Sequence, residues 1–498
     1  MSRQDQIINE RKRKLQELKE KGINPYPNKF EQKDFSEDIK QENIKLKNDQ
    51  RSKVKVKVAG RVMTKRNLGK LIFTTIQDSK GKIQLILQGQ ETAKESFEIF
   101  KKYIDSGDFV GAEGIVMKTK TGEVSVLVKK VQILSKSLSP LPEKFHGIQD
   151  KEERYRRRYL DLIMNPEVKD VFLKRTIIID IIRNFLKQEN FIEVETPTLQ
   201  SIYGGASATP FKTHLNALDV DLFLSISPEL YLKRLIVGGI DRVFTICKNF
   251  RNEGIDWFHN PEFTMMEYYA AYKNYEYHIK FTEGLFNKLK KELNLSETIE
   301  YQGKKINLKT PFKRIKFRDL ILEKTKIDID KEDTFSKLKN EINSKKLKEV
   351  NINDCKHYGA LLDELYKRVV RPNIIQPTFL THYPVEMIAL AKRNEQDPKK
   401  INSVQLLING AEILKAYDEL NDPLDQENRL KEQAELLKKG DNEAMPMDED
   451  FINALKIGMP PTAGYGLGID RIVMILTNQP SIRDVILFPF MKPEEKES

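Results

Sequence analysis

Cysteine and tryptophan are scarce in this sequence, and it has no long apolar run. The 498 residues include two cysteines, Cys247 and Cys355, and one tryptophan. Two cysteines so far apart cannot build a disulfide framework or a cysteine-rich zinc site, which favours a reducing compartment. No apolar run approaches the roughly 18 to 20 residues that cross a bilayer, so we expect no membrane partner. The first 22 residues are charged throughout and lack the apolar segment of a signal peptide, so we expect a cytoplasmic protein.

The composition is that of a globular protein with a basic surface. Hydrophobic residues make up 39% of the chain and charged residues 32%, and the length suits two or three domains. The formal net charge is +11, which favours a polyanionic partner such as nucleic acid. Lysine, isoleucine and asparagine are abundant everywhere, however, so a general drift in composition explains the charge equally well.

Two regions of different character follow one another along the chain. Residues 1–50 predict an N-terminal helical extension, whose first helix ends at Gly22. Residues 51–138 contain short β-branched and apolar runs separated by glycine and Asp-Ser turns. They predict five strands, with a helix between the third and the fourth, in a small Greek-key barrel of the OB type.

The remainder predicts a larger mixed domain. Residues 139–158 contain prolines that favour an extended linker. From 159 to 495 helices alternate with strand hairpins without regular βαβ order, which predicts an α+β domain with a mainly antiparallel sheet. Residues of about 275–370 are rich in lysine, asparagine and glutamate with helical patterning, and they predict a helical insertion.

The stretch FRNEGIDWFHNPEFT, residues 250–264, combines charged and aromatic side chains at a predicted strand–loop–strand turn. An arginine can neutralise a phosphate, a phenylalanine offers a stacking face, and a glutamate accepts from an exocyclic amine. Arg251, Glu253 and Phe263 therefore predict a nucleotide site. A salt-bridged exposed hairpin is the alternative interpretation.

A glycine-lined strand, PPTAGYGLGIDR, leads into an apolar helix near the C-terminus. Gly464, Gly466 and Gly468 let a backbone pass close to another group, and Arg471 at the helix start can hold a terminal phosphate. A tightly packed core strand would explain the glycines as well. The pattern is a weak dinucleotide fingerprint, because no βαβ unit surrounds it.

Three glutamates in two further stretches are candidates for a charged pocket. Glu229 follows a proline at a helix start, where a capping role is the plain alternative. Glu412 and Glu419 belong to a predicted strand in which strict alternation places them on opposite faces. A twist or a β-bulge would be required to bring both into one site.

Together these stretches resemble one family over nearly the whole chain, the class II lysyl-tRNA synthetases of the bacterial type. NFIEVETPTL is similar to the first class II motif, FRNEG with HNPEFT to the second, and GLGIDR to the third. GGASATPF, SPELYLKRLIVGG, AYDELNDP and LFPFMKPE are typical of the lysine enzymes. The resemblance implies an OB-fold anticodon-binding barrel followed by a class II catalytic domain.

The resemblance implies a lysine–tRNA ligase that uses ATP, L-lysine and tRNA(Lys). Lysine would react with ATP to give lysyl-adenylate and pyrophosphate, and would then pass to the 3′ end of the tRNA for translation. Arg251, between the α-phosphate and the lysine carboxylate, and Arg471, at the γ-phosphate, are the implied catalytic residues. The other implied ATP residues are Glu253 and Phe263 at the adenine and His259 and Asn260 at the nucleotide tail.

The resemblance also implies a set of lysine-binding residues. Glu229 is the implied partner of the α-amino group, and Tyr269 and Glu419 are the implied partners of the ε-ammonium. A buried ammonium needs a carboxylate, because an unpaired buried charge costs on the order of several kcal/mol. The full implied set is Gly205, Glu229, Arg251, Glu267, Tyr269, Lys415 and Glu419.

Three departures from the family concern the same region. The family usually has two glutamates seven residues apart that hold Mg²⁺, the implied cofactor; here the second is Glu412 and the first is Gln405, a weaker ligand. Lys415 stands where the family has an asparagine near the substrate carboxylate. Ile388-Ala389 replaces the usual Ser-Pro, with a consequence that the sequence does not reveal.

In the barrel, four residues match the family's anticodon-reading positions. Aromatic stacking combined with amide hydrogen bonds suits single-stranded, uridine-rich RNA. Phe73 could instead belong to the barrel core. The four are Arg66, Phe73, Gln84 and Glu123.

Two other functions remain open from the sequence. An aspartyl- or asparaginyl-tRNA synthetase has a similar layout, but Glu419 would repel an acidic substrate. A non-catalytic paralogue that binds RNA through its barrel is the second, although Arg251 and Arg471 are both present. The apolar segment IIIDIIRNFLKQENFIEVETP, which resembles a two-fold interface motif, predicts a homodimer.

Overall fold

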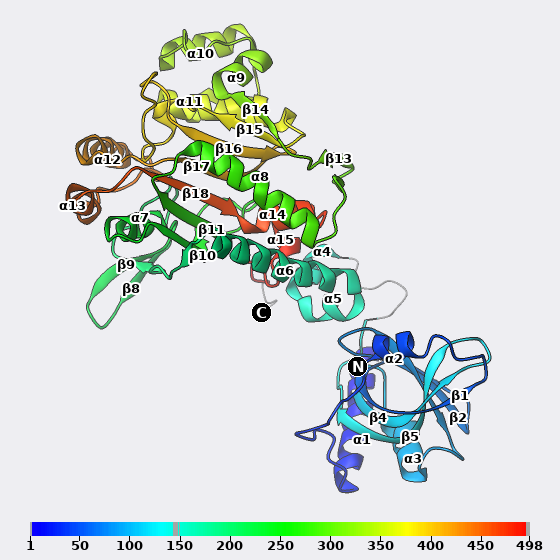
Figure 1. Cartoon of the computed structure of the whole chain (residues 1–498). Helices are drawn as coiled ribbons and strands as arrows, with labels where there is room; N and C mark the ends of the chain where they lie inside the picture. Colours follow the sequence, from blue (N-terminus) through cyan, green and yellow to red (C-terminus); the bar gives the residue numbers. More distant parts are fainter. Residues whose placement is uncertain (1, 143–147, 149, 495–498) are drawn as a thin grey trace. The chain divides into compact units, whose positions relative to one another are not determined.

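A computed structural model describes residues 2–142, 148 and 150–494. The chain divides into two compact units, Met1–Ile148 and Gln149–Ser498. The described residues contain no helix with the length and apolar character needed to cross a membrane. Figure 1 shows both units with their helices and strands labelled.

Unit 1 is a closed five-stranded barrel with the strand order β1-β2-β3-β5-β4. The strands are β1 (Arg51–Asn67), β2 (Leu71–Gln77), β3 (Lys82–Gln88), β4 (Phe109–Lys118) and β5 (Val124–Ser135). Helix α3 (Lys94–Tyr103) connects the third strand to the fourth, and its Phe97 and Phe100 pack into the barrel core. This is the predicted OB-type barrel.

The predicted extension, residues 1–50, packs onto this barrel. It forms α1 (Arg3–Glu20) and α2 (Ser36–Glu42), and it contributes Leu18 and Ile39 to the barrel core. Buried Arg11 donates hydrogen bonds to the backbone carbonyl groups of Ser106 and Ser139. Residues 2–50 are therefore a part of unit 1, and residue 1 lies outside the described residues.

Unit 2 is built on an eight-stranded sheet of order β14-β15-β16-β17-β18-β11-β10-β6. The pairs β14·β15 and β10·β6 are parallel and the others antiparallel, which confirms the prediction of a mainly antiparallel sheet. The strands in that order are Lys313–Lys316, Thr378–Thr381, Ser403–Ile408, Ala411–Asp418, Thr462–Gly468, Glu262–Ala271, Arg242–Phe250 and Ile192–Glu193. Two small sheets join β12 (Thr298–Tyr301) with β13 (Lys304–Asn307), and β7 (Leu199–Gln200), β9 (Val220–Leu224) and β8 (Lys212–Leu215).

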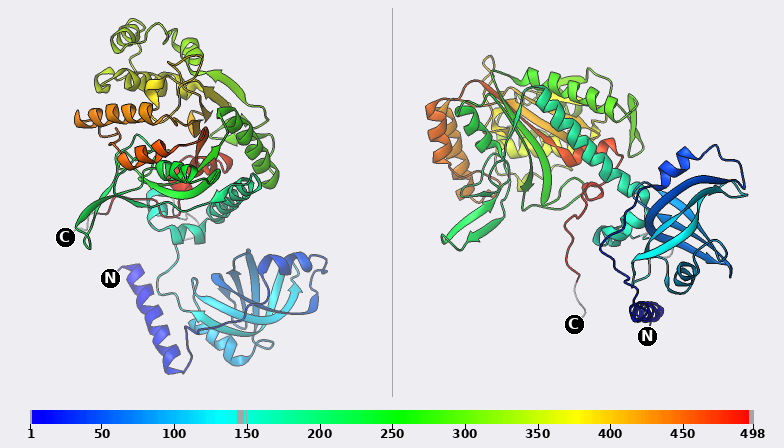
Figure 2. Two further views of the ribbon diagram at one scale, coloured as in Figure 1. Left: turned by 60° about the vertical axis from the view of Figure 1, so that its left-hand side comes forward. Right: turned by 60° about the horizontal axis from the view of Figure 1, so that its bottom comes forward.

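Helices cover both faces of this sheet. The long helices α6 (Pro166–Gln188) and α8 (Tyr275–Glu292) run along one face beside α14 (Ile469–Leu476), as Figure 1 shows. Their apolar sides form the largest core with the sheet, through residues such as Ile182, Leu285 and Val473. In Figure 2, α7 (Glu229–Val237), α12 (Pro423–Lys438) and α13 (Glu449–Ile457) gather on the other side, and α15 (Ile482–Val485) is the last described helix.

The predicted linker, residues 139–158, is shorter in the structure. Within it, α4 (Lys151–Arg156) begins because Asp150 caps the helix, accepting from the backbone N–H of Glu153 at 2.8 Å, and α5 (Arg158–Met164) follows. Unit 2 therefore starts before the predicted residue 159. Residues 143–147 and 149 of that linker, and residue 495 at the predicted domain end, lie outside the described residues.

The predicted helical insertion, about 275–370, is only partly separate and only partly helical. Helix α8 packs into the main core, and β12, β13 and β14 also lie in this range. The separate part forms its own core from α9 (Phe317–Thr325), α10 (Phe335–Ser344), α11 (Tyr358–Leu365) and the π-helical segment η2 (Tyr366–Val370). Short 3-10 turns occur at η1 (Ile352–Asp354), η3 (Arg371–Asn373) and η4 (Val385–Met387).

Candidate active site

One cavity of about 1010 Å³ lies over the strands β16, β17, β18 and β11 in unit 2. It brings together residues that are far apart in sequence, from Gly205 to Arg471. The predicted residues that line it are Gly205, Glu229, Arg251, Glu253, His259, Asn260, Phe263, Glu267, Tyr269, Gln405, Glu412, Lys415 and Arg471. Ile388 and Ala389 also contribute to its wall.

The floor of the cavity is formed where β18 pairs with β11. Gly464, Gly466 and Gly468 stand opposite Tyr269, Glu267 and Met265 in the antiparallel register. A Cβ atom at Gly464 would lie 1.9 Å from a carboxylate oxygen of Glu419 and 2.6 Å from the ring of Tyr269, so a larger residue would displace both buried side chains. The glycines therefore leave room for the side chains of the neighbouring strands, and they do not form a dinucleotide loop.

A β-bulge settles which side chains of β17 face the cavity. In the pairing with β16, Leu407 stands opposite Glu412 and Leu406 opposite Leu414, so Ile413 is the extra residue. Because of this extra residue, the side chain of Glu412 lies on the same face as that of Lys415. A β-bulge of this kind is one of the two irregularities that the sequence pattern required. Lys415 in turn stands directly opposite Gln405 on β16.

One end of the cavity, here called the carboxylate end, is defined by Glu229, Glu267, Glu419 and Lys233. The ammonium of Lys233 lies 2.6 Å from Glu229 and 2.5 Å from Glu419. Lys233 is fully buried, and both glutamates are almost fully buried. Glu419 itself lies behind the lining of the cavity, against Gly464 and Tyr269.

This end holds more carboxyl groups than its own ammonium can balance in their ionised form. Burial raises the pKa of Glu419 well above its ordinary value despite Lys233, and burial with the neighbouring Glu229 raises the pKa of Glu267 to about 8. Two carboxylates also raise the pKa of Lys233 against the effect of burial, so that lysine stays charged. The carboxylate end is therefore suited to a further ammonium group.

Hydroxyl groups hold these carboxylates in place. Tyr417 donates to Glu229 at 2.9 Å, and Ser227 donates to Glu267 at 3.2 Å. Both oxygens of Glu419 are buried without an aligned hydrogen bond in the described part of the chain, although Lys233 is close enough for an ion pair. Buried polar atoms normally have partners, so this carboxylate has unused capacity to accept from a ligand.

Lys233 was not among the residues predicted from the sequence. It follows Glu229 by four positions on α7, a spacing at which side chains of a helix meet. That spacing in SPELYLK was the available signal. The second partner, Glu419, comes from the end of β17 and could not be inferred from the helix.

Gly205 lies in a loop beside the same end. Its backbone has a φ of +84°, in the left-handed region that favours glycine. A Cβ atom there would lie 2.8 Å from the Cβ of Glu229 and 3.0 Å from the hydroxyl oxygen of Ser227. A side chain at position 205 would therefore collide with Glu229 and Ser227.

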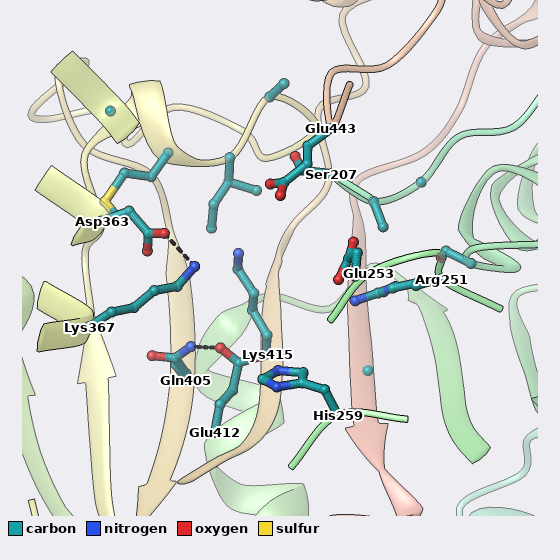
Figure 3. A pocket seen from close by; sticks show the side chains of 18 of the residues that line it. Ser207, Arg251, Glu253, His259, Asp363, Lys367, Gln405, Glu412, Lys415 and Glu443 are labelled. Atoms are coloured by element: carbon teal, nitrogen blue, oxygen red, sulfur yellow. Dashed lines mark hydrogen bonds and ion pairs between the residues drawn. The ribbon is translucent and has the colours of Figure 1, made fainter. Parts of the chain in front are cut away.

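The hairpin of β10 and β11 supplies the middle of the cavity. Arg251 follows β10, and its guanidinium lies 5.1 Å from the centre of the Phe263 ring. Arg251 Nε and Asn260 Oδ1 are buried without hydrogen-bond partners among the described residues. Glu253, which is exposed, lies beside Arg251 in Figure 3. An arginine, an aromatic ring and unpartnered polar atoms together form a cradle for an anionic, ring-containing ligand.

The opposite end, here called the cationic end, is defined by Glu412, Lys415, Arg471, Lys367 and Arg371. Arg471 donates to the backbone carbonyl of Glu412 at 2.8 Å and lies 3.2 Å from Nε2 of His259. Asp256 contacts the other ring nitrogen of His259 at 2.8 Å. This chain of contacts joins the motif around residue 259 to the helix start at Arg471.

Lys367 and Arg371 were also not predicted, because they come from the partly helical insertion. Lys367 lies in the π-helical segment η2 and Arg371 directly follows it; both line the cavity. Lys367 forms an ion pair with Asp363 at 2.6 Å. Such π-helical turns often occur at functional sites, so the segment itself is a signal, but one that only the structure provides.

The cationic end surrounds a single carboxylate with positive charge. Burial alone would raise the pKa of Glu412, but the surrounding cations bring it below its ordinary value. These cations are Lys415, Arg471, Arg371 and Lys367.

The residues at the cationic end do not fit a metal ion held by the protein. The described residues contain no group of three or more His, Cys, Asp or Glu side chains that could hold one. Tyr366 and Tyr383 both donate to the amide oxygen of Gln405, and its NH₂ group faces Glu412. The amide must be oriented this way, because only its NH₂ can donate to a carboxylate. Gln405 therefore has no free oxygen with which to bind Mg²⁺, the role expected from the sequence. Of the two expected ligands, Glu412 alone remains.

The predicted anticodon residues lie on the outer wall of the barrel in unit 1. Arg66 and Phe73 stand opposite each other on β1 and β2, and Phe73 packs partly buried outside the main barrel core. Gln84 donates to Glu123 at 3.0 Å. Phe73 is thus not a residue of the barrel interior.

Comparisons with known proteins agree with this architecture. Residues 150–492 match the family of class II tRNA synthetases (D, K and N), and residues 56–134 match the OB-fold nucleic acid binding domain. Curated relatives named lysine–tRNA ligase extend over nearly the whole chain. That of Pelotomaculum thermopropionicum is 47% identical, covering 99% of this chain and 96% of the relative. Those of Thermosipho africanus and Fusobacterium nucleatum are 46% and 45% identical, covering 99% and 98% of this chain and 97% and 98% of the relatives.

A barrel of the nucleic-acid-binding type thus precedes an antiparallel catalytic sheet whose cavity carries the matching motifs, and the family match extends well beyond half of the chain. The chain belongs to the class II tRNA synthetases (D, K and N).

Proposed function

We propose that this protein is a lysine–tRNA ligase. It activates L-lysine with ATP to lysyl-adenylate and pyrophosphate, and it transfers lysine to the 3′ end of tRNA(Lys) for translation. The observation that carries the proposal is the carboxylate end, where Glu229, Glu267 and Glu419 share the single ammonium of Lys233. A substrate with two ammonium groups suits that excess of carboxyl groups and favours their ionised form, whereas aspartate would bring a further carboxylate. The names of the relatives support the same substrate.

Lysine lies, in this proposal, with its side chain toward the carboxylate end. Glu419 and Tyr269 hold the ε-ammonium with Glu267 nearby, and Glu229 and the loop at Gly205 receive the α-ammonium. Lys233 keeps Glu229 and Glu419 in position and leaves them short of positive charge. The lysine carboxylate then points to Arg251 and Lys415 in the middle of the cavity.

ATP lies along the hairpin and extends to the cationic end. Phe263 stacks on adenine and Glu253 accepts from its amino group, while Arg251 contacts the α-phosphate. The nucleotide tail extends past Asn260 and His259 to Arg471, which takes the γ-phosphate. The unpartnered Arg251 Nε and Asn260 Oδ1 support this placement, since a ligand would satisfy them.

The chemistry requires no side-chain nucleophile. The lysine carboxylate attacks the α-phosphorus in line and pyrophosphate leaves; the tRNA 3′-terminal hydroxyl then attacks the adenylate carbonyl and AMP leaves. Arg251 neutralises charge on the α-phosphate and orients the attacking carboxylate, and Arg471 stabilises the leaving pyrophosphate. Positioning and charge neutralisation account for such catalysis in phosphoryl transfer generally.

Mg²⁺ would accompany ATP in this proposal and would neutralise part of the phosphate charge. At the cationic end Glu412 would be the carboxylate that faces it, although one of its oxygens already accepts from Gln405. No step of the mechanism above depends on a metal held by the protein.

The barrel reads the anticodon of the tRNA through Arg66, Phe73, Gln84 and Glu123. Phe73→Ala should remove one stacked base, a loss of roughly 1–3 kcal/mol in tRNA binding. Aminoacylation should fall while lysine-dependent pyrophosphate exchange stays intact. A parallel fall of both activities would show that Phe73 serves the fold of unit 1 and not the RNA.

The protein acts as a homodimer in the cytoplasm in this proposal. Helix α6 and the strand after it expose Leu173, Ile177 and Ile192, which suits an interface near the first class II motif. Both cysteines are free thiols, consistent with a reducing compartment. Light scattering should give twice 58.0 kDa, and a monomer with full activity would contradict the dimer.

The experiment that tests the function is ATP–pyrophosphate exchange across a panel of amino acids. Lysine should support exchange, and aspartate and asparagine should not. Exchange with aspartate or asparagine would replace the proposed substrate. Complete inactivity with every amino acid, while the protein still binds RNA, would favour a non-catalytic RNA-binding protein.

A further inference from the structure

The cationic end can neutralise negative charge with side chains and without a bound metal ion. The first observation in support concerns Gln405. The amide of Gln405 is locked between two tyrosine hydroxyl groups and Glu412. It is 3% exposed, so it cannot turn toward a ligand without breaking this network. A carboxylate in its place would face Glu412 with a like charge and would need a cation between them. As it is, no such cation is required.

Lys415 is the second sign. Figure 3 shows its ammonium pointing from β17 into the open middle of the cavity, between the Lys367–Asp363 pair and Arg251. The described residues offer Lys415 no hydrogen bond or ion pair, whereas Arg471 and Lys367 are both engaged. A cation directed into a cavity without a partner on the protein is available to an anionic ligand.

The combined change in charge at positions 405 and 415, relative to the residues that the family usually has there, equals the charge of one divalent ion. A glutamine in place of a glutamate removes one negative charge, and a lysine in place of an asparagine adds one positive charge. Gln405 and Lys415 stand opposite each other on paired strands, so both changes act on the same space. Together they make that space more positive by the charge of one Mg²⁺.

We propose that the ammonium of Lys415 binds the phosphates of ATP next to the reacting α-phosphate and replaces a divalent cation that two carboxylates would otherwise hold there. Gln405, fixed by its tyrosines, keeps Glu412 in place without creating a second metal ligand. The inference rests on the proposed function for the identity of ATP. It makes Lys415 a binding residue for the phosphates as well as a neighbour of the lysine carboxylate.

Binding of ATP without metal is the direct test. Isothermal titration of ATP into the full-length protein is carried out once with EDTA and once with excess Mg²⁺, with lysine absent. The variants are Lys415→Asn, Lys415→Arg and the control Lys356→Asn. Lys356 lines the same cavity but is exposed and donates to the carbonyl of Gly440.

Lys415→Asn should weaken metal-free ATP binding by about tenfold or more, because one charge contact to phosphate is lost. With Mg²⁺ the same variant should lose about threefold or less, because the ion on ATP replaces the missing charge. Lys415→Arg should retain most of the metal-free affinity, and Lys356→Asn should change neither value. Equal losses with and without Mg²⁺, or wild-type protein that fails to bind ATP in EDTA, would overturn the inference.

A count of bound metal ions gives a second readout that does not depend on activity. Mn²⁺ serves as a spectroscopic probe, titrated by electron paramagnetic resonance into the protein with saturating ATP. The double variant Gln405→Glu with Lys415→Asn should bind one more Mn²⁺ per chain than the wild type does. An equal number in both proteins would contradict the replacement of an ion by Lys415.

Different measurements test the proposed function and the proposed role of Lys415. If the wild type shows no lysine-dependent exchange with Mg²⁺ present, the proposed function fails. If exchange is normal but metal-free ATP binding does not depend on Lys415, only the further inference fails.

Discussion

The two ends of the cavity handle charge in opposite ways. The carboxylate end is closed: Glu229, Glu419 and Lys233 are between 0% and 4% exposed, and one ammonium serves two carboxylates. At the cationic end, the side chains of Glu412 and Arg471 are 32% and 22% exposed. Several cations there surround one carboxylate, and water has access.

The difference in burial decides how much each charge matters. Coulomb interactions are several times stronger in a site closed to water than in one partly open to it. A buried charge without a partner is also costly, which is why burial raises the pKa values of Glu419 and Glu267. We therefore expect the carboxylate end to determine which amino acid binds, and the cationic end to tune the binding of phosphate.

The largest effect should come from Glu419→Gln, which keeps the shape of the side chain and removes its charge. Breaking a buried ion pair typically costs about 3–5 kcal/mol, so lysine-dependent exchange should fall by roughly two to four decades. The free energy of unfolding of the ligand-free protein should stay equal or rise, because Lys233 then serves one carboxylate and not two.

The control for this variant is Glu435→Gln, an exposed carboxylate on α12 that pairs with Lys438. It should leave exchange unchanged. If Glu419→Gln is silent in the exchange assay, the amino acid binds elsewhere and lysine loses its support as the substrate.

The next effect concerns stability and comes from Lys233→Met. Removing the single ammonium leaves Glu229 and Glu419 facing each other without a counter-ion, which should lower the free energy of unfolding at pH 7 by about 3–5 kcal/mol. The loss should shrink at pH 5, because without Lys233 the folded-state pKa of Glu419 rises still further above its value in the unfolded chain. The folded state then binds more protons, so its stability falls as the pH rises.

Urea denaturation at the two pH values measures this difference, with Lys438→Met on the surface of α12 as a control. An equal loss at pH 5 and pH 7 would show that Lys233 contributes packing and not charge.

A smaller effect is expected from pH on lysine binding. Burial and Glu229 raise the pKa of Glu267 to about 8, so in the free protein this carboxyl group is largely protonated at pH 7. An ammonium favours the ionised form, so affinity for lysine should rise from pH 6 toward pH 8, by at most about tenfold per pH unit for one group.

Calorimetry in two buffers of different ionisation enthalpy should also detect a proton released on binding. Glu267→Gln should flatten the dependence. Constant affinity between pH 6 and pH 8 would mean that Glu267 is ionised throughout or lies too far from the substrate.

The smallest effect should come from Lys415→Asn at the cationic end, measured in the same exchange assay with saturating ATP and Mg²⁺. Arg251 already serves the lysine carboxylate and the site is partly open, so lysine affinity should change by about tenfold or less, or about 1.4 kcal/mol. If this variant is as damaging as Glu419→Gln, the contrast between the two ends is wrong.

Much of the architecture could be predicted from the sequence, because the patterns that carry it are local. The strand runs and turns of residues 51–138 predict the barrel, and the alternation of FRNEG…HNPEFT predicts the β10–β11 hairpin. Glycine at 464 and 466 predicts a close approach, which the register with Tyr269 and Glu267 confirms. Local patterns are reliable where the neighbours in sequence are also the neighbours in space.

The composition of the two ends depends on contacts between segments that are distant in sequence. The bulge at Ile413 depends on the pairing of β17 with β16, and it alone turns Glu412 to the face of Lys415. Lys233 acquires its second partner from the end of β17, and Lys367 reaches the cavity from the insertion. The charged groups can be read directly from the amino-acid sequence. Their pairing, burial and pKa values follow from distances across the fold, which no local pattern encodes.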